Sequence, residues 1–210
     1  MQNNTPVIAL TFDDGPNTVL TPKVLDILEE NDAVVTFFYV GENITEEAVP
    51  VMKRAVSLGC EIGNHSLTHA HMPDELTKEQ IIEEVNITSQ KIKAVLGKEP
   101  VFFRPPFFEY DEKMLEVIDK PFITGEGIDD WLPEVGEQER IDRVLSLAKD
   151  GAIILLHDFP GNECTMEALK SILPALKERG FKTVTVSQLF ETKGKKPENG
   201  VVYTKVEGEG

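Results

Sequence analysis

Cysteine is scarce in this sequence of 210 residues, which contains only Cys60 and Cys164. The two cysteines form no CxxC pair and no closely spaced group. This excludes a zinc ribbon and a small domain held together by several disulfides. A single long-range disulfide and two free thiols are both compatible with these positions, so the cysteines do not define the redox compartment.

Long apolar runs and several catalytic motifs are also absent. No stretch approaches the roughly 18 apolar residues of a membrane-spanning helix, and we expect no membrane span. The first residues, MQNNTPVIALTF, lack the basic and apolar segments of a signal peptide. The sequence has no GxSxG elbow, no P-loop and no GxGxxG after a strand. A glycosidase that uses two carboxylates remains compatible with the residue types.

Positive charge is in short supply: 21 Lys and Arg stand against 37 Asp and Glu, a net charge of −16. Such a chain repels nucleic acid and anionic membranes, so we expect no nucleic-acid partner. A neutral polysaccharide is not repelled, although the acidity alone fits a solubility role equally well. With 40% hydrophobic and 28% charged residues, the composition is that of an ordinary globular protein with one sizeable core.

Short apolar runs alternate with helical patterns along the chain. The runs are nearly continuous, which is typical of strands buried on both faces: 7–12, 33–40, 60–64, 101–104, 121–124, 152–157 and 181–186. Seven strands alternating with helices predict a parallel sheet in an α/β fold. Closure into a barrel is the expected architecture, with an open doubly wound sheet as the alternative.

Helix boundaries can be predicted from capping residues. Thr21 precedes a proline and is expected to cap the first helix. Gly59 is expected to end a helix over 46–58, and Thr77 to open a long one, through a capping box, that stops at Gly97. Further helices are expected over 137–149 and 165–179. We assign residues 1–192 to one catalytic domain and 193–210 to a flexible or edge-hugging tail.

Polar side chains with catalytic potential come at or just after the predicted strands. They are Asp13, Asp14, His65, His69, Arg104, Asp129, Asp130, His157 and Asp158. Active groups of parallel α/β folds gather at the carboxyl ends of the strands. This shared placement predicts a single site at one edge of the sheet.

Asp14, His65 and His69 are candidate metal ligands. Adjacent carboxylates at 13 and 14 repel unless a cation or a shared proton relieves them, although Asp-Gly-Pro is also good turn chemistry. Histidine nitrogens four residues apart suit zinc and related metals. Three protein ligands leave a coordination position open, and water bound to zinc at an open position has its pKa lowered to about 7. His71 is expected to be a bystander, with a smaller chance of being an alternative ligand.

A hydrolase with such a centre also needs a base and an acid. Asp13 beside the metal and His157 across the cleft fit these roles. Arg104 could keep the base ionised through a charge-assisted pair, although an arginine at a strand end is more often structural.

Five motifs occur in a characteristic order: TFDDGP (11–16), HSLTH (65–69), RPPF (104–107), DDW (129–131) and LLHD (155–158). This pattern resembles the polysaccharide deacetylases of carbohydrate esterase family four, which carry the NodB homology domain. The resemblance covers about residues 5–190. It implies a distorted (β/α)7 barrel and a metal-dependent hydrolase that removes acetyl groups from polysaccharides.

The resemblance also implies a role for each matched residue. Asp13 would be the base and His157 the acid, with Arg104 orienting the first and Asp130 tuning the second. Asp14, His65 and His69 would bind one divalent ion, with zinc expected and cobalt or nickel as alternatives. The backbone N–H of Phe107 would contribute to an oxyanion hole. Trp131 and Leu156 would line the pocket around the acetyl methyl group.

Two departures from the family pattern bear on the substrate. Phe107-Phe108 replaces the usual Tyr-Gly, and Gly127 replaces the first Asp of the usual DxxDW, which is expected to weaken the support of the acid. The RPPFFE pattern resembles bacterial acetylxylan esterases. The expected substrate is therefore O-acetylated xylan, followed by polymers of N-acetylglucosamine. A carbohydrate-binding barrel without catalysis is the alternative of another class. We expect an extracellular protein, either a monomer or a module of a larger enzyme.

Overall fold

The computed structural model describes residues 5–208. Residues 1–4 and 209–210, at the outer ends of the regions assigned from the sequence, lie outside the described part. The strands are β1 (Val7–Asp13), β2 (Thr36–Tyr39), β3 (Glu61–Asn64), β4 (Phe122–Ile123), β5 (Glu126–Gly127), β6 (Ile153–His157), β7 (Lys182–Thr183) and β8 (Val202–Tyr203).

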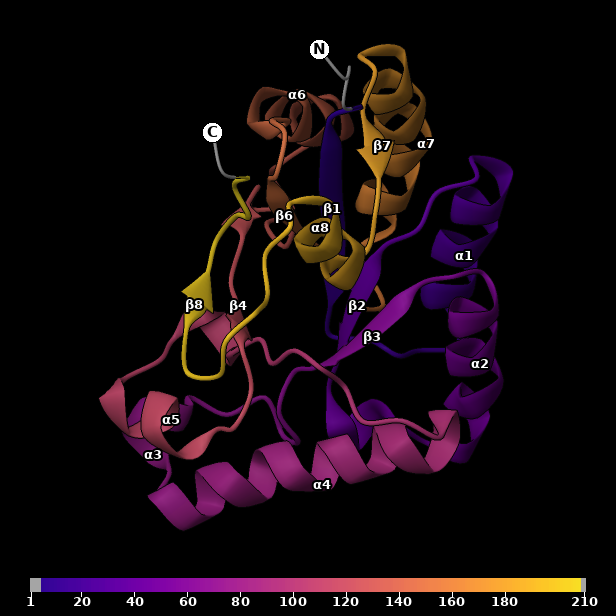
Figure 1. Ribbon diagram of the computed structural model, residues 1–210. Helices are drawn as coiled ribbons and strands as arrows, with labels where there is room; N and C mark the ends of the chain where they lie inside the picture. The colour runs from indigo at the N-terminus through magenta and orange to yellow at the C-terminus, as the bar shows by residue number, and fades with distance from the viewer. Residues whose placement is uncertain (1–4, 209–210) are drawn as a thin grey trace.

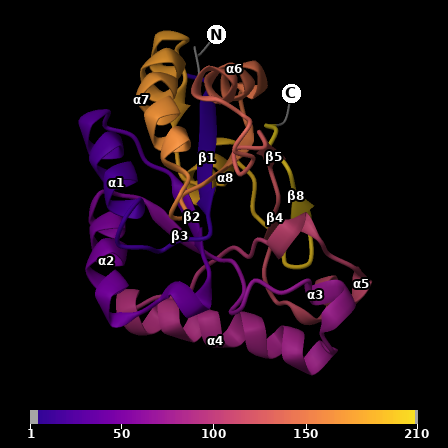
Figure 2. The ribbon, with the colours of Figure 1, turned by 180° about the vertical axis from the view of Figure 1, so that it is seen from behind.

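Helices connect most of these strands (Figures 1 and 2). They are α1 (Thr21–Glu30), α2 (Val49–Ser57), α3 (Met72–Glu75), α4 (Lys78–Leu96), α5 (Glu112–Val117), α6 (Glu137–Leu147), α7 (Glu163–Glu178) and α8 (Val186–Thr192). Short 3-10 turns occupy Gly41–Asn43, Glu46–Ala48 and Pro106–Phe108. No helix in the described range is long and apolar enough to cross a bilayer.

The strands pair in parallel, as the alternation of strands and helices predicts. The main sheet has the order β3-β2-β1-β6-β5, and β7 pairs with the start of β1. A second, two-stranded sheet joins β4 to β8, side by side in both views of the ribbon. Single bridges from Phe103 to Asn64 and to Phe122 link this small sheet to the free edge of β3. The sheet therefore curls into an irregular barrel instead of staying open.

Strand β1 shows why the sheet is buried on both faces. Ile8, Leu10 and Phe12 belong to the large core beneath α1, α2 and α7, whereas Val7 and Ala9 pack in a second cluster with α8. Successive side chains of a strand point to opposite faces. Asp13 therefore continues the inner row of Val7 and Ala9, and it reaches the inside of the barrel at its carboxyl end.

Most helix boundaries predicted from capping residues are confirmed. Thr77 and Gln80 form the reciprocal bonds of a capping box at the start of α4, and Gly97 ends that helix with a left-handed φ of 76°. The prediction for Thr21 is wrong. Thr21 lies inside α1, and the side-chain oxygen of Asn17 accepts the backbone N–H bonds that precede the helix.

The carboxyl-terminal segment follows the edge of the barrel. Val202 and Tyr203 pair in parallel with β4, and Lys205 forms a bridge to Ala152 beside β6. Val206 is buried in the inner cluster. Of the two behaviours expected for this tail, the described part adopts the edge-hugging one. Both cysteines are free thiols, Cys60 buried and Cys164 partly buried.

Candidate metal centre and active site

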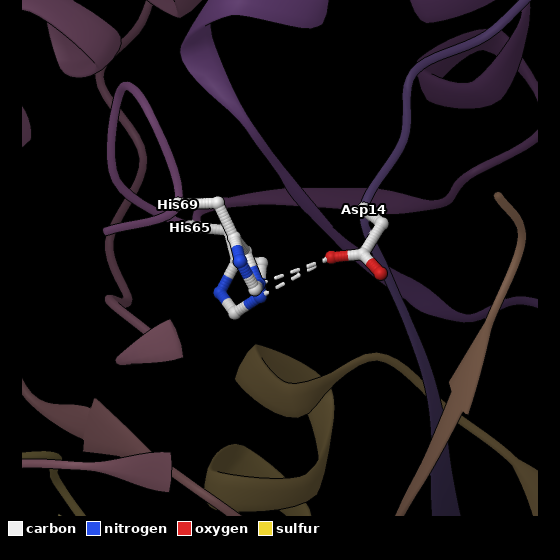
Figure 3. A group of neighbouring side chains, drawn as sticks. All are labelled: Asp14, His65 and His69. Carbon is white, nitrogen blue, oxygen red and sulfur yellow. Dashed lines mark ion pairs between the residues drawn. The ribbon is translucent and has the colours of Figure 1, made fainter. Parts of the chain in front are cut away.

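Asp14, His65 and His69 converge at the carboxyl ends of β1 and β3. Figure 3 shows both imidazole rings turned toward the carboxylate of Asp14. Asp14 Oδ1 lies 3.6 Å from His65 Nε2 and 3.3 Å from His69 Nε2. The three ligand atoms all lie within 4.8 Å of one another. The structure therefore brings together the three residues expected as ligands.

The spacing of these atoms fits a shared divalent cation. Ligand atoms about 2.0–2.2 Å from one ion at tetrahedral angles lie about 3.3–3.6 Å apart, close to the two contacts of Asp14 Oδ1. Two imidazole nitrogens and one carboxylate oxygen also form the donor set that zinc accepts in catalytic sites. The residues present thus fit the metal that the sequence predicts.

The environment of His65 prepares its ring for coordination. Its Nδ1 lies 2.8 Å from the backbone oxygen of Arg104. Because a carbonyl oxygen can only accept a hydrogen bond, Nδ1 must carry the proton and donate it. This bond leaves the lone pair of Nε2 directed at Asp14, as is usual for histidines that bind metals. Burial lowers the pKa of His65 to about 3, against the opposing charge of Asp14, so the ring is neutral.

The backbone around the ligands is held in uncommon conformations. Asp14 has a φ of 73° and His69 a φ of 61°, both in the left-handed region that side chains other than glycine rarely adopt. Side chains from neighbouring segments hold these turns: Asn43 donates to the backbone oxygen of Asp14, and Ser66 accepts from the N–H of His69. Such conformations persist where the surrounding structure imposes them, as at binding sites.

Asp13 lies next to the ligands but is held by a buried cation. Arg104 Nη1 donates to Asp13 Oδ1 at 2.7 Å and to Thr11 Oγ1 at 2.7 Å, and both members of the ion pair are buried. Burial raises the pKa of Asp13, while the charge of Arg104 acts in the opposite direction. The second oxygen, Oδ2, stays on the side of the ligands, 3.5 Å from His65 Nε2.

His157 faces the ligands from the adjacent strand. The register of β1 and β6 makes it the direct partner of Asp13. Its Nδ1–H donates to Asp130 Oδ1 at 2.7 Å, and its backbone N–H donates to Asp130 Oδ2 at 2.9 Å. Burial lowers the pKa of His157, but the bond to Asp130 and the nearby carboxylates outweigh it and raise the pKa to about 9. The ring is therefore protonated at neutral pH.

A cavity of about 390 Å³ opens above these groups. The residues that line it are Asp13, Asp14, His65, His69, Phe107, Phe108, Trp131, Leu155 and His157. Trp131 forms one apolar wall, with its ring edge-on to the ring of His157 at 5.5 Å. Phe107 lies on the ligand side, edge-on to the ring of His69 at 4.6 Å.

The prediction for Leu156 is wrong. Leu156 is fully buried in the large core, and the neighbouring Leu155 lines the cavity. The reason is the two-residue period of a strand, which places Leu155 and His157 on one face of β6 and Leu156 on the other. That period, counted back from His157, is the sequence signal that would have identified Leu155.

The segment after Arg104 keeps its turn without the usual glycine. Phe107 and Phe108 have φ values of 56° and 59°, so Phe108 adopts a left-handed conformation where the family pattern has glycine. The backbone N–H of Phe107 meets no acceptor among the described residues. This donor is thus free to face a ligand, as an oxyanion hole requires.

His71 is not part of the ligand group. Its ring stacks on Phe107 at 3.9 Å between centroids, and its Nδ1 bonds to Glu109 at 2.8 Å. The bond to Glu109 raises the pKa of His71. The expectation that His71 is a bystander to the metal ligands fits this placement.

The sequence of this chain matches a known protein family. The sequence model of the family described as polysaccharide deacetylase matches residues 1–121. The chain belongs to the polysaccharide deacetylase family. A bifunctional xylanase/deacetylase of Pseudobutyrivibrio xylanivorans is 44% identical to this chain. The aligned region covers 92% of this chain and 32% of that relative. The chain thus spans about a third of the length of that relative.

Solved structures agree with this assignment. The Xyl-CE4 domain of a multidomain xylanase, from the hindgut metagenome of Trinervitermes trinervoides, superposes with a TM-score of 0.94 at 42% identity. The match covers 98% of this chain and 100% of that domain. A family 4 acetyl xylan esterase from Clostridium thermocellum, in complex with a cobalt ion, gives 0.92 at 37% identity over 95% and 98% of the chains. Peptidoglycan deacetylases of Bacillus cereus match at 33% and 34% identity.

These similarities confirm three predictions made from the sequence. The family resemblance is correct, and the fold is the distorted (β/α)7 barrel of this family. The domain is an enzyme of the carbohydrate esterase and deacetylase class.

Proposed function

We propose that this domain removes O-acetyl groups from acetylated xylan by metal-dependent hydrolysis. One observation carries the proposal: Asp13 and His157, partners across β1 and β6, flank the Asp14, His65 and His69 cluster at the mouth of one cavity. A base and an acid beside a three-ligand cluster are the components of a hydrolytic site.

We assign Asp14, His65 and His69 as the ligands of one divalent ion, with zinc as the expected metal. Two nitrogens and one oxygen also suit cobalt and nickel, so those ions are expected to substitute. When bound, the ion supplies Lewis-acid chemistry: it polarises the acetyl carbonyl and favours ionisation of water. Neutral His65 and the fixed direction of its Nε2 support this assignment.

Asp13 acts as the general base in this proposal. Arg104 occupies its Oδ1, so Oδ2 is the oxygen that takes a proton from the attacking water. The buried pair with Arg104 also fixes the direction of the carboxylate, and a general base must lie within hydrogen-bond reach of its proton.

His157 acts as the general acid. Its Nδ1–H is tied to Asp130, so the proton on Nε2 is the one that passes to the leaving oxygen. The backbone N–H of Phe107 donates to the carbonyl oxygen as negative charge builds up on it. Trp131 and Leu155 offer apolar walls for the acetyl methyl group.

The choice of xylan rests on the relatives and on charge. The xylanase/deacetylase and the two xylan-related structures support an O-acetyl substrate, while the peptidoglycan deacetylases support the alternative of N-acetylglucosamine polymers. A net charge of −16 suits a neutral polymer. The similarity to a domain of a multidomain xylanase supports a role as a module of a larger enzyme, and we further propose that the domain acts outside the cell.

Gly127 does not weaken the support of His157, contrary to the expectation from the sequence. Asp130 accepts bonds from that histidine through both of its carboxylate oxygens, so Gly127 gives no support to an ester substrate. A Cβ at position 127 would contact Trp131 and Leu155 at 3.7 and 3.8 Å, on the side of the cavity. A side chain at position 127 would therefore add to the wall of the cavity that Trp131 and Leu155 form.

The proposal is tested by acetate release from acetylated xylan and from chitooligosaccharides at matched zinc concentration and pH. We expect faster release from xylan. Faster release from the amide substrate would replace xylan with an N-acetylated glycan and leave the hydrolytic site intact. Binding to glycans without acetate release from any of them would favour a carbohydrate-binding barrel.

A further inference from the structure

The carboxylate of Asp130 has more partners than the histidine that it orients. Besides both contacts with His157, its Oδ2 accepts from Thr165 Oγ1 at 2.8 Å and from Asn162 Nδ2 at 3.1 Å. Asn162 and Thr165 stand at the amino-terminal start of α7, and both are buried. Oδ2 is thus saturated by three donors, which leaves Oδ1 to His157 alone.

Behind these two residues lies a buried cation, Arg140. It stands in the first turn of α6 and is 3% exposed. Its Nη1 donates to Asn162 Oδ1 at 2.5 Å and to Thr165 Oγ1 at 2.7 Å, while Nε donates to the backbone oxygen of Val135. Within residues 5–208 it forms no ion pair with any carboxylate. A buried guanidinium without a direct counter-ion needs another source of compensation.

The chemistry of the groups fixes the direction of every bond in this chain. A guanidinium only donates and an ionised carboxylate only accepts. The single hydroxyl proton of Thr165 must therefore point to Asp130, and the amide of Asn162 must turn its oxygen to Arg140 and its nitrogen to Asp130. Two parallel relays, each one residue long, thus connect the cation to the carboxylate.

We infer that Arg140 is a positioning residue for the general acid and acts on His157 through Asn162, Thr165 and Asp130. The inference rests on the proposed function of His157. Arg140 is not among the residues that line the cavity. It orders the two relays, holds the carboxylate of Asp130 in one orientation and so keeps the proton of His157 on the atom that faces the substrate. Networks of buried hydrogen bonds strengthen one another in this way.

The relay predicts an effect that depends on the leaving group. An aryl acetate such as 4-nitrophenyl acetate expels a phenolate that needs little protonation, whereas a sugar alkoxide needs the acid. In the zinc-loaded domain, Arg140→Met should lower acetate release from acetylated xylan about tenfold, a part of the usual 10²–10⁴-fold worth of an acid or base. Release from the aryl acetate should change less than twofold.

Two further variants and a spectroscopic readout complete the experiment. Thr165→Val keeps the shape and the cation but cuts one relay, so its effect on xylan should lie between wild type and Arg140→Met. Arg179→Met is the control, because that arginine is exposed and its side chain, among residues 5–208, donates only to the backbone oxygen of Leu145. Nitrogen-15 NMR of the histidines should show a changed pKa for His157 in Arg140→Met and no change in the control.

The outcomes separate this inference from the proposed function. The role of Arg140 would be overturned if folded Arg140→Met lost acetate release equally from xylan and from the aryl acetate. It would also be overturned if the pKa of His157 were unchanged in both Arg140→Met and Thr165→Val. Wild-type protein that releases no acetate would overturn the proposed function instead, and the NMR comparison would still decide whether Arg140 acts on His157.

Discussion

At the level of single residues, two buried arginines each support a different carboxylate of the site. Arg104 contacts Asp13 directly, whereas Arg140 reaches Asp130 only through neutral side chains. A direct ion pair keeps one carboxylate oxygen of Asp13, the proposed base, occupied and fixes its direction. The indirect arrangement leaves Asp130 free to accept both bonds from His157. Asp13 and His157, the proposed base and acid, are thus each held by a bond on the side away from the cavity, and each keeps one polar atom, Oδ2 or Nε2, for the proposed chemistry.

Asp13→Asn tests the separation between base and metal ligand. Asn cannot take the proton of the attacking water, so acetate release should fall about 10²–10⁴-fold. Bound zinc, measured by elemental analysis, should stay at one ion per chain, because Asp14, His65 and His69 are unchanged. Arg104 loses its counter-ion in this variant, and a lower thermal midpoint is expected because an uncompensated buried charge is costly.

Turnover close to wild type in folded, zinc-loaded Asp13→Asn would rule out Asp13 as the base. Loss of zinc together with activity would instead make Asp13 a ligand. Circular dichroism serves as the control for folding.

At the level of elements, sequence patterns predicted the strands that carry the site. The runs that became β1, β3 and β6 are apolar and end in polar residues, so their type and their ends were readable. The capping box of α4 was equally clear, because its residues bond to one another within four positions. These features depend on local chemistry alone.

Other elements depend on contacts that the sequence does not display. The strand predicted over 101–104 is reduced to isolated bridges at Phe103. Of the strand predicted over 181–186, only Lys182–Thr183 forms β7, and Thr185 caps the start of α8 instead. The two-residue strands β5 and β8 form only through their hydrogen bonds to neighbouring strands, β6 and β4 respectively. Helix α1 has no side-chain cap: Asn17, four residues before Thr21, accepts from the N–H groups of Val19 and Leu20 just ahead of the helix. Arg140, Asn162 and Thr165 carry no motif, and only the packing of α6 on α7 brings them to Asp130.

Thr77→Ala tests the capping box of α4. The change removes the acceptor for the N–H of Gln80 and should lower the free energy of unfolding by about 1 kcal/mol in urea denaturation. Acetate release should not change, since α4 supplies no side chain to the cavity lining. Thr204→Ala is the matched control, because Thr204 is exposed and its side chain makes no hydrogen bond within the described residues. Equal stability of the two variants would contradict the assigned cap.

At the scale of the whole molecule, the parallel barrel explains why the proposed ligands, base and acid lie at one edge. β1, β3 and β6 all run in the same direction, so the Asp13-Asp14 pair, His65 and His157 lie at the same end although these three segments are far apart in sequence. The family assignment and the fold follow from motifs spread along the whole chain. The acidic surface adds a preference against anionic polymers but does not select among neutral ones.

The central claim is that Asp14, His65 and His69 hold the ion on which deacetylation depends. Its most direct test is acetate release from acetylated xylan by purified protein, before chelation, after chelation and after reloading with zinc, in wild type and His65→Ala. We predict that chelation abolishes release, that zinc restores it in wild type, and that His65→Ala neither binds one equivalent of zinc nor regains activity. Undiminished release from wild-type protein shown to be free of metal, or one tightly bound zinc in His65→Ala, would contradict the account.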